Sequence, residues 1–502
     1  MADARVFAAV DLGAETGRVV VGRFNGGSIS IEVVHRFANR PLWLPDGLHW
    51  NLPGLFDSIL AGLSRAADAA GPLDSIGIDS WGVDYALLDG SGRMLGLPFH
   101  YRDERVSDDV IARAHARVGR AELYSRTGIQ TLPINTIFQL IAEEDGRAAA
   151  EAEQIALVPD LLAYWLTGEL ANEVTIASTT GLLEATEPRW ARDLITRLGL
   201  PERPFAGEVV EPASPLGRVR SSHADIAGAA TGTSVQTVAA HDTASAFAAA
   251  PLRGRHAAVL SSGTWSLLGL EVAAPFLGPD AAAFNLTNER GLDGTIRLLR
   301  NVMGLWLLQE CRREWSAAGM ASDYDELHRL ASAAPPDVPL FDPDLPALLR
   351  GGEVPALINA ACTAAGQGAP AGPGELARSI LVSLACKYRL VLEQLQLVSG
   401  RRVEVVHVVG GGARNALLCQ LTADLLELPV LAGPEESTAL GNVLVQARGL
   451  GEIASLTELR ELVGGSVRVT RFEPSGQPTR ETYERFLAVT GLATHRPAGA
   501  AA

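Results

Sequence analysis

Lysine is almost absent from the sequence. Lys387 is the only one, so every other residue among the 42 lysines and arginines is an arginine. A P-loop of the GxxxxGK[ST] type and the protein-kinase fold each need a lysine in a defined context, and neither context occurs. A Schiff-base mechanism would depend on Lys387 alone. This residue lies in 375–395, ELARSILVSLACKYRLVLEQL, where apolar residues recur at helical spacing. The pattern predicts a surface or groove position for Lys387 on a core helix.

The sequence also has few cysteines, no long apolar run and no excess of positive charge. The four cysteines have no CxxC spacing, which argues against a zinc site or a disulfide framework and favours free thiols in a reducing cytoplasm. No stretch reaches the ~18 uninterrupted apolar residues of a membrane span. The N-terminus lacks the basic and apolar segments of a signal peptide. The net charge of −16 argues against binding to nucleic acid or to an anionic membrane. We therefore expect a cytoplasmic protein whose partners are small molecules.

The size and composition are those of a large globular protein. At 502 residues, 47% hydrophobic and 20% charged, the chain is too long for one ordinary core, and two large domains, or three, are expected. We predict domains at 1–246 and 247–485, followed by a disordered tail at 486–502. Residues 331–374 are rich in Pro, Ala and Gly, which predicts a surface excursion inside the second half.

Two hairpins of similar pattern occur, one in each half of the chain. A strand, a turn and a second strand are predicted across 6–24, and the same order is predicted across 256–272. Each half also contains a strand that leads into a glycine-containing turn, in 74–89 and in 403–428. In the second of these, Asn415 is expected to cap the following helix. This weak internal symmetry favours two α/β domains of related topology.

Three turns contain residues that suit phosphate or nucleotide binding. Asp11 ends a buried strand and precedes a glycine turn with Thr16 and Arg18. The carboxylate could hold magnesium, directly or through water, while turn N–H groups and hydroxyls hold phosphate oxygens. SSGTWS (261–266) could close on phosphates from the opposite side, and the glycines of GGGARN (410–415) could let a flat adenine approach the backbone. Each could also be an ordinary turn or connection, but three in one chain, two in symmetric places, favour the functional interpretation.

Other polar motifs are ambiguous when taken alone. In WGVDY, Trp81 could stack on a sugar while Asp84 accepts hydroxyl protons, or the segment could be an ordinary strand edge. The segment HYRDER (100–105) is expected to be a solvated loop or a salt-bridge cluster rather than a site. His407 lies inside an apolar strand and is expected to be a core histidine.

His241 and Asp242 stand between two apolar runs in TVAAHDTASAF. An isolated buried carboxylate is costly unless it has a partner or a shifted pKa. One interpretation is a general base in a cleft, and the other is a hydrogen-bonded carboxylate at a domain hinge. Neither spacing nor composition decides between them.

Taken together, six motifs resemble those of the FGGY carbohydrate kinases, most closely the members that phosphorylate L-rhamnulose. The motifs are VDLGAETGR, GIDSWGVDY, AAHDTASAF, SSGTWSLLG, LLRNVMGLWLLQ and VVGGGARN, in this order, and the resemblance runs over nearly the whole chain. It implies an α/β fold of two actin-like (ribonuclease H-like) ATPase domains with a cleft between them. It also implies transfer of the γ-phosphoryl group of ATP, with Mg²⁺, to O1 of L-rhamnulose to give L-rhamnulose 1-phosphate.

The resemblance assigns roles to the residues at the matching positions. Asp242 would be the base that takes the proton from O1, and Asp11 would be a magnesium ligand. The sugar would be lined by Gly82, His241, Asp242 and Thr243. The first phosphate turn would comprise Ala14, Glu15, Thr16, Gly17 and Arg18, and the nucleotide would contact Thr264, Asn301, Gln309 and Gly411. Glu15 stands where this family often has a small hydroxyl residue, and we expect its side chain to point away from the phosphate.

The sequence leaves other functions open. The acceptor could be another ketose or a polyol, with L-fuculose as one example. The chain could instead be an actin-like ATP-dependent binding or chaperone-type protein without a sugar acceptor. Either a monomer or a homodimer is compatible with the sequence.

Overall fold

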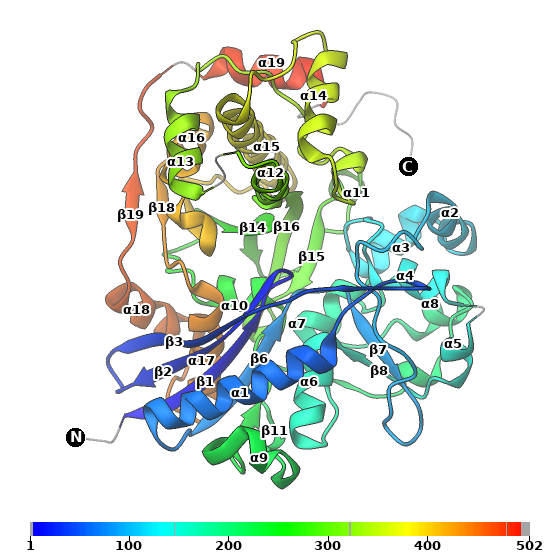
Figure 1. Cartoon of the computed structure of the whole chain (residues 1–502). Helices are drawn as coiled ribbons and strands as arrows, with labels where there is room; N and C mark the ends of the chain where they lie inside the picture. Colours follow the sequence, from blue (N-terminus) through cyan, green and yellow to red (C-terminus); the bar gives the residue numbers. More distant parts are fainter. Residues whose placement is uncertain (1–3, 145, 321–322, 478, 493–502) are drawn as a thin grey trace. The chain divides into compact units, whose positions relative to one another are not determined.

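The computed structural model describes residues 4–144, 146–320, 323–477 and 479–492 (Figure 1). The chain forms two compact units, each assembled from several segments. The first unit comprises Met1–Pro251, Glu271–Leu298 and Ser437–Val467, and the second comprises Leu252–Leu270, Leu299–Glu436 and Arg468–Ala502. The single division predicted between residues 246 and 247 stays a prediction.

The first unit contains a mixed sheet in the order β11-β12-β6-β1-β2-β3. β1 pairs antiparallel with β2 and parallel with β6, and β6 pairs parallel with β12. The hairpin predicted across 6–24 is therefore confirmed, with a shorter turn than the sequence indicated. The strands of this sheet are β1 (Arg5–Leu12), β2 (Thr16–Phe24), β3 (Ile29–Ala38), β6 (Ser75–Ser80), β11 (Pro215–Arg218) and β12 (Ser234–Gln236).

Two helices cover opposite faces of this sheet. α1 (Leu52–Ala70) packs on β2 and β3, where a side chain at Gly62 would collide with Val19. α17 (Ser437–Gly449) packs on β1 and β6, and Val443 lies against the backbone of Gly22. α17 also packs against the short helix α10 (Asp242–Ala248), which continues from the segment that follows β12. Gly62 on α1 and Gly22 on β2 let the two helices approach the sheet closely.

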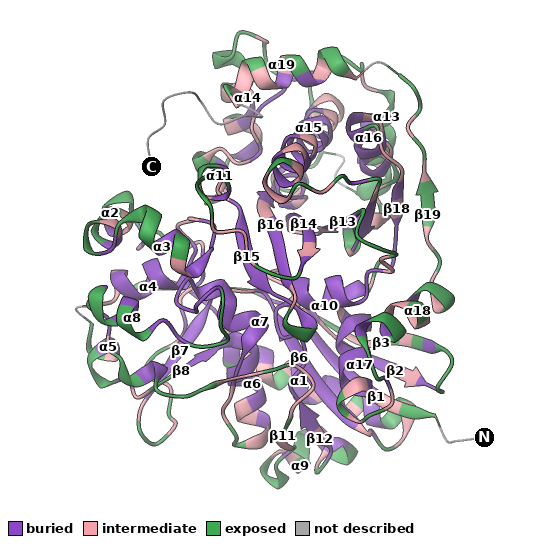
Figure 2. Cartoon of the chain, turned by 180° about the vertical axis from the view of Figure 1, so that it is seen from behind, coloured by how far each residue is buried: buried purple, intermediate pink, exposed green. Residues whose placement is uncertain are grey.

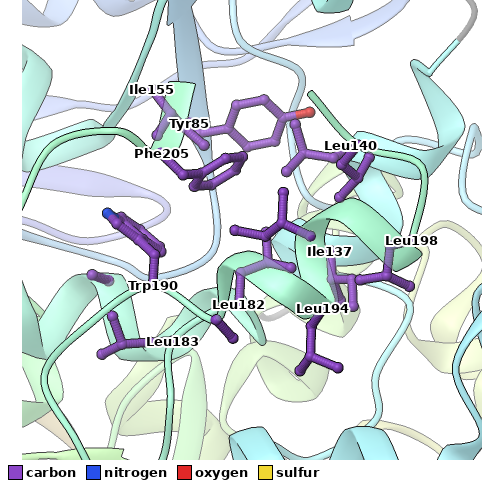
Figure 3. Packing of buried hydrophobic residues seen from close by; sticks show 14 of the residues in the cluster. Tyr85, Ile137, Leu140, Ile155, Leu182, Leu183, Trp190, Leu194, Leu198 and Phe205 are labelled. Atoms are coloured by element: carbon purple, nitrogen blue, oxygen red, sulfur yellow. The ribbon is translucent and has the colours of Figure 1, made fainter. Parts of the chain in front are cut away.

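A second core of the first unit lies beside this sheet and is built from short elements. Tyr85 on β7 (Tyr85–Leu88) and Ile155 on β8 (Gln154–Leu157) contribute to it, together with Trp190 and Phe205 (Figure 3). The remaining elements of the first unit are β4 (Leu42–Leu44), β5 (Gly47–His49), α2 (Asp108–Arg117), α3 (Arg120–Thr127), α4 (Thr136–Ala142), α5 (Arg147–Glu151), α6 (Val158–Thr167), β9 (Asn172–Glu173), α7 (Val174–Ala177), α8 (Arg192–Arg197), β10 (Val209–Val210), α9 (Ala224–Ala227), α11 (Pro279–Ala283), β15 (Thr287–Arg290) and α18 (Leu456–Ser466).

The second unit is built on strands that lie in the order β16-β14-β13-β17-β18-β19. The hairpin β13–β14 and the connection from β17 into α16 agree with the sequence prediction, and the Asn415 side chain accepts a hydrogen bond from Leu418 N at the start of α16. The strands are β13 (Ala257–Ser262), β14 (Trp265–Val272), β16 (Ile296–Met303), β17 (Val405–Val409), β18 (Val430–Ala432) and β19 (Thr470–Phe472). The helices are α12 (Trp306–Ala317), α13 (Tyr324–Ala333), α14 (Val354–Ala364), α15 (Pro373–Ser399), α16 (Ala416–Leu426) and α19 (Arg480–Thr490).

The prediction of a surface or groove position for Lys387 is wrong. This side chain on α15 is completely buried, and Nζ lies 2.7 Å from Asp342 Oδ1 and 3.0 Å from Asp344 Oδ2. Both carboxylates belong to the segment that was predicted to be a surface excursion. That segment also contains helix α14 and the buried Leu340 and Phe341, so it is partly a core element of the second unit.

The predicted start of the disordered tail is also wrong. Residues up to Thr490 are part of α19, and Phe486 is completely buried among Tyr483, Leu390 and Leu425. Its aromatic ring gives the helix an apolar contact that the sequence interpretation missed. Residues 493–502 lie outside the described residues. Figure 2 shows that burial follows the central strands and the inner helices, and within the described part of the chain no helix combines the length and apolarity needed to cross a bilayer.

Candidate active site

Asp242 is the first residue of helix α10 in the first unit. The residue before it, His241, forms a parallel bridge with Ser80 at the end of β6. Ser80 N donates to Ala240 O at 2.9 Å, which fixes the chain just before the helix. The Asp242 side chain keeps 30% of its surface exposed. Its Oδ1 accepts from Thr243 N at 2.5 Å and from Thr243 Oγ1 at 3.0 Å. Among the described residues none donates to Oδ2, so one carboxylate oxygen is held and the other is available to a ligand.

Asp242 belongs to a group of three neighbouring carboxylates, with Asp11 and Asp79. Asp11 and Asp79 are register partners at the ends of the parallel strands β1 and β6. Asp79 is completely buried, its Oδ2 accepts from Asn442 Nδ2 at 2.6 Å, and its Oδ1 has no hydrogen-bond partner among the described residues. Burial raises the pKa of Asp79 well above its usual value, and the charges of Asp11 and Asp242 raise it further.

Burial and neighbouring charges also shift the pKa of Asp242. Burial is the largest cause of a raised pKa at Asp242, a positive charge on His241 would act in the opposite direction, and the charge of Asp11 adds to the rise. Hydrogen bonds from Thr243 also stabilise the charged form. A carboxylate with a raised pKa is a stronger proton acceptor, which is what a general base requires.

The turn that follows Asp11 is well defined. Gly13 N donates to Thr16 O at 2.9 Å, and Asn39 Nδ2 donates to Gly13 O at 3.0 Å. Ala14 and Glu15 are partly exposed and Thr16 is exposed, so the turn is accessible to a ligand. A side chain at Gly17 would collide with the Phe37 ring, since its Cβ would lie 2.3 Å from a ring carbon. The assignment of this turn to phosphate stays a prediction.

Arg18 has a specific partner inside the unit. Its Nε and Nη2 donate to Asp11 Oδ2 at 2.9 and 2.6 Å. The guanidinium that was predicted to contact phosphate therefore lies on the predicted magnesium ligand. This pairing balances one of the three carboxylates of the group.

The residues around Asp11 fit a magnesium ion. Asp79 Oδ1 is a buried oxygen without a hydrogen-bond partner among the described residues, and the charges of Asp11 and Asp242 both raise the pKa of Asp79, so a cation at this place would relieve the repulsion. Within the described ranges, no three ligating side chains lie close enough to hold a metal alone. That arrangement suits Mg²⁺, because it keeps several waters and usually takes one or two carboxylates plus phosphate oxygens.

Of the two interpretations of WGVDY, the structure favours the packed strand edge, because both oxygens of the Asp84 carboxylate already accept hydrogen bonds inside the protein. Its Oδ2 accepts from Trp50 Nε1 at 2.6 Å and from Trp81 Nε1 at 2.9 Å, and its Oδ1 accepts from Gln139 Nε2 at 2.9 Å. Asp84 is 1% exposed, and burial raises its pKa to about 6 although these three donors oppose the shift. Asp84 therefore holds two indoles in place, and the Trp50 and Trp81 rings lie 4.1 Å apart.

The backbone at Val83, between Trp81 and Asp84, is strained. Val83 has φ 70°, and Asp84 N donates to Gly82 O at 3.0 Å across it. A β-branched residue with positive φ is an outlier that persists only when its surroundings enforce it. Thr179 Oγ1 accepts from Val83 N at 3.1 Å, and Thr136 Oγ1 donates to Val83 O at 2.5 Å. Gly82 is the partly exposed residue between the buried Trp81 and Val83, so its backbone is what the turn offers to a ligand.

The segment 100–105 is a loop in which Glu104 is exposed and Arg105 forms a salt bridge, as expected, but its first two residues are buried. His100 is buried and stacks on Trp50 with 4.0 Å between ring centroids, and burial lowers its pKa to about 3. Arg105 pairs with Glu143 and donates to Gln139 Oε1 at 2.6 Å. The salt-bridge interpretation holds for Arg105, whereas His100 belongs to the aromatic support of Asp84. His407 is buried in β17, as expected of a core histidine.

The second unit brings together three segments with predicted nucleotide contacts: the turn in 261–266, the segment that leads from β16 into α12, and the turn in 410–415. The turn after β13 packs backbone to backbone against the start of α12, because Gly304 N donates to Thr264 O at 3.1 Å and a side chain at Gly304 would collide with that turn. Gly412 lies against Ser262, where a Cβ would come within 2.0 Å of Oγ. The segments that carry the predicted nucleotide residues therefore meet near the end of β13. These residues are Thr264 after β13, Asn301 on β16, Gln309 on α12 and Gly411 in the turn after β17. Their contacts with a nucleotide stay predictions.

Asp79 and Trp50 are the site residues that the sequence interpretation missed. Asp79 is part of GIDSWGVDY, and its alignment with Asp11 follows from the parallel pairing of two buried strands. The strand pattern could have suggested it. Nothing local to Trp50 indicates its bond to Asp84, because the two residues are far apart in the sequence.

Comparison with known proteins settles the family. Residues 6–248 match the N-terminal domain model of the FGGY family of carbohydrate kinases, and residues 258–450 match the C-terminal domain model. The chain belongs to the FGGY family of carbohydrate kinases. It is accordingly a sugar kinase, and enzymes of this family use ATP as co-substrate with Mg²⁺.

Relatives within the FGGY family are similar over most of their length. A rhamnulokinase of Bacteroides thetaiotaomicron is 39% identical over 470 residues, which cover 93% of this chain and 96% of that protein. A rhamnulokinase of Pectobacterium carotovorum is 41% identical over 476 residues, covering 93% of each chain.

Solved structures support the two-domain FGGY kinase fold. A gluconate kinase from Lactobacillus acidophilus matches with a TM-score of 0.76 at 15% identity over 96% of both chains. A glycerol kinase from Plasmodium falciparum, solved with ADP, matches with a TM-score of 0.73 at 14% identity over 96% of this chain and 97% of that one. The mixed α/β sheets agree with the predicted actin-like architecture.

Proposed function

We propose that this FGGY kinase transfers the γ-phosphoryl group of ATP to O1 of L-rhamnulose, with Asp242 as the general base. The observation that carries the choice of reaction is the Asp242 carboxylate, with Oδ1 held by Thr243 and Oδ2 left open. The choice of sugar is supported by rhamnulokinases that are about 40% identical over more than nine-tenths of the chain.

In this proposal the chain's own residues position the acceptor and remove its proton. Asp242 Oδ2 accepts the proton of the O1 hydroxyl as the oxygen attacks phosphorus, and ADP leaves with the electron pair of the broken bond. Phosphoryl transfer depends mostly on alignment and charge neutralisation, and a positioned base adds ~10²–10⁴-fold. The Gly82 backbone and His241 line the sugar, and Thr243 supports Asp242.

Magnesium and the nucleotide take the positions that the sequence motifs indicate. Asp11 would hold Mg²⁺, which neutralises phosphate charge when it is bound. The turn of Ala14, Glu15, Thr16 and Gly17 would hold phosphate oxygens through backbone N–H groups. Thr264, Asn301, Gln309 and Gly411 would contact the nucleotide.

The cellular context is part of the same proposal. All four cysteines are free and buried, which agrees with a reducing cytoplasm, where ATP is also available. A monomer or a homodimer would both accommodate the reaction.

A coupled ADP-release assay tests the choice of sugar. The enzyme with MgATP would be offered L-rhamnulose, L-fuculose, L-ribulose, D-xylulose, D-fructose and glycerol. We expect kcat/KM to be highest for L-rhamnulose and the product to be the 1-phosphate by ³¹P NMR. A higher kcat/KM for another acceptor would identify that acceptor as the substrate in place of L-rhamnulose. ADP release that is equal with and without every sugar would contradict the kinase assignment.

A further inference from the structure

A buried charged cluster lies directly behind His241 in the first unit. It consists of Glu289 on β15 and Arg297 on the first-unit part of β16, both of which contact the imidazole. Arg297 is 0% exposed and Glu289 is 3% exposed. The roles proposed above do not use either residue. Burying a guanidinium is costly unless its donors find fixed acceptors, so this cluster needs an explanation.

The guanidinium of Arg297 is oriented by three fixed partners. Its Nε donates to the backbone oxygen of Arg290 at 3.1 Å, and Nη1 lies 3.1 Å from Glu289 Oε2. Its Nη2 lies 3.1 Å from His241 Nδ1 in hydrogen-bond geometry. The planar fork of arginine therefore fixes the direction of the N–H group that faces the imidazole.

This contact decides which ring nitrogen of His241 carries the proton. A guanidinium can only donate, so Nδ1 must accept the hydrogen bond from Nη2. A hydrogen on Nδ1 would point at the hydrogen of Nη2. Burial lowers the pKa of Arg297, and the charges of Glu289, Asp242 and Glu173 oppose that shift. The guanidinium stays charged, as arginine does in proteins. The neutral tautomer with its proton on Nε2 is the one that fits.

The competing tautomer is the one that Glu289 would favour. Glu289 Oε2 lies 3.2 Å from Nδ1 and could accept a proton carried there. In that case Nε2 would be bare and would face Asp242 Oδ1, another acceptor, at 3.5 Å. With the proton on Nε2, the same approach becomes a donor facing a carboxylate. Arg297 and Glu289 also neutralise each other, so the imidazole need not become charged to satisfy Glu289.

We infer that Arg297 is a positioning residue that holds His241 as the Nε2–H tautomer, so that the imidazole presents an N–H donor to Asp242 and to the acceptor sugar. Glu289 holds the guanidinium in place. The donor on the Oδ1 side directs the proton-accepting role to Oδ2 and stabilises the carboxylate before the reaction. The kinetic consequence rests on the proposed function, whereas the tautomer itself does not.

Nitrogen NMR of the full-length protein tests the tautomer directly. The protein contains ten histidines, so ¹⁵N-histidine labelling gives a small set of ring signals, and those lost in His241→Gln belong to His241. Protonated and bare ring nitrogens have well separated ¹⁵N shifts. We expect Nε2 of His241 to be protonated and Nδ1 to be bare in the wild type. A protonated Nδ1 in the wild type would overturn the inference without any variant having to fold.

Two variants separate positioning from general loss of stability. In Arg297→Met, Nδ1 should become protonated, because it then faces the Glu289 carboxylate without the competing guanidinium. The control, Lys387→Met, removes another completely buried cation with two carboxylate partners, and the His241 signals should stay unchanged. An unchanged tautomer in folded Arg297→Met, or the same change in the control, would contradict the role of Arg297.

Kinetics provide the second measurement. We expect kcat for sugar phosphorylation to fall about tenfold or more in Arg297→Met, as part of the ~10²–10⁴-fold supplied by a positioned base. The KM for MgATP should stay within about twofold, because the lost interaction acts on the acceptor side. An unchanged kcat with a large rise in that KM would contradict the inference. If the tautomer is as expected but no sugar is phosphorylated, the proposed function fails and the tautomer assignment stands.

Discussion

At the scale of single residues, the two oxygens of Asp242 differ. Thr243 supplies two hydrogen bonds to Oδ1, one from its backbone N–H and one from its hydroxyl. The hydroxyl can be removed without changing the backbone donor. The contribution of Thr243 to catalysis is therefore measurable by itself.

Thr243→Ala removes the hydroxyl donor and should lower kcat about three- to tenfold, since one such hydrogen bond contributes roughly 0.5–1.5 kcal/mol. Thr243→Ser keeps the hydroxyl and should retain nearly the wild-type kcat. Steady-state kinetics with saturating MgATP and sugar measure both variants. Equal losses in the two variants would mean that the methyl group matters and that the hydrogen bond to Asp242 does not.

At the scale of elements, the turn after β6 is held by the bonds of Asp84 to two indoles and an amide. The pKa of Asp84 is raised to about 6, so the folded state binds a proton that the unfolded state has lost. This proton-linked stability is fully present below about pH 4, the ordinary pKa of an aspartate, and is lost as the pH rises through about 6. The full change corresponds to about 3 kcal/mol for a shift of about two units.

Asp84→Asn should remove this pH dependence while keeping an oxygen for the two indole N–H groups. We expect the free energy of unfolding of the wild type to fall more steeply between pH 4 and pH 6 than that of the variant. Urea denaturation at several pH values, followed by tryptophan fluorescence, provides the comparison. Parallel pH profiles for the two proteins would show that Asp84 does not titrate in this range.

The packing of α17 on α10 gives a second prediction at this scale. A Cβ at Gly441 would lie 2.0 Å from the backbone oxygen of Ser245, one turn after Asp242. Gly441→Ala should therefore displace α10, lower stability by about 1–3 kcal/mol and reduce kcat. Gly464→Ala on α18 is the matched control, because nothing lies within 4 Å of the position that a Cβ would take there and alanine is the better helix former. Thermal unfolding and kcat measured together test the pair, and equal effects at both positions would contradict this packing.

At the scale of the whole molecule, the chain forms two units and passes from one to the other several times. Its single lysine lies in the second unit, where it is completely buried between two aspartates. Breaking such a pair leaves an uncompensated buried charge, so Lys387 should stay protected while that unit is folded. Its chemical reactivity therefore reports opening of the second unit.

An amine-directed reagent should leave Lys387 unmodified in the native protein and modify it in urea. Peptide mass spectrometry after brief labelling measures the modified fraction at this one position. An added lysine-containing peptide serves as the control for reagent activity. Rapid modification of Lys387 under native conditions would contradict the buried ion pairs.

The parts of the fold that sequence predicted well depend on local signals. The hairpin β1–β2 follows from apolar runs around a glycine turn, and the cap at Asn415 follows from one side chain and the helix that it begins. Lys387 was misplaced because the helical pattern shows an apolar stripe but not the carboxylates of Asp342 and Asp344 that come from another segment. Long-range partners of this kind leave no trace in local periodicity.

The candidate site shows the same limit. Asp242 stood out because a carboxylate interrupts an apolar run, whereas Glu289 and Arg297 lie on β15 and β16, which are neighbours in a sheet, and reach His241 from there. Two interpretations of Asp84 stayed open, because its partner Trp50 comes from a separate segment that the local pattern does not show. Chemistry could be predicted where residues are adjacent in the sequence, and positioning could not.

The most direct test of the account compares wild type and Asp242→Asn in phosphorylation of L-rhamnulose by MgATP. The substitution keeps the size of the side chain and removes its ability to accept the proton. We predict that kcat falls by ~10²–10⁴-fold, with thermal unfolding and the KM for MgATP close to wild type. Turnover of Asp242→Asn within a few-fold of the wild type would contradict the assignment of Asp242 as the base.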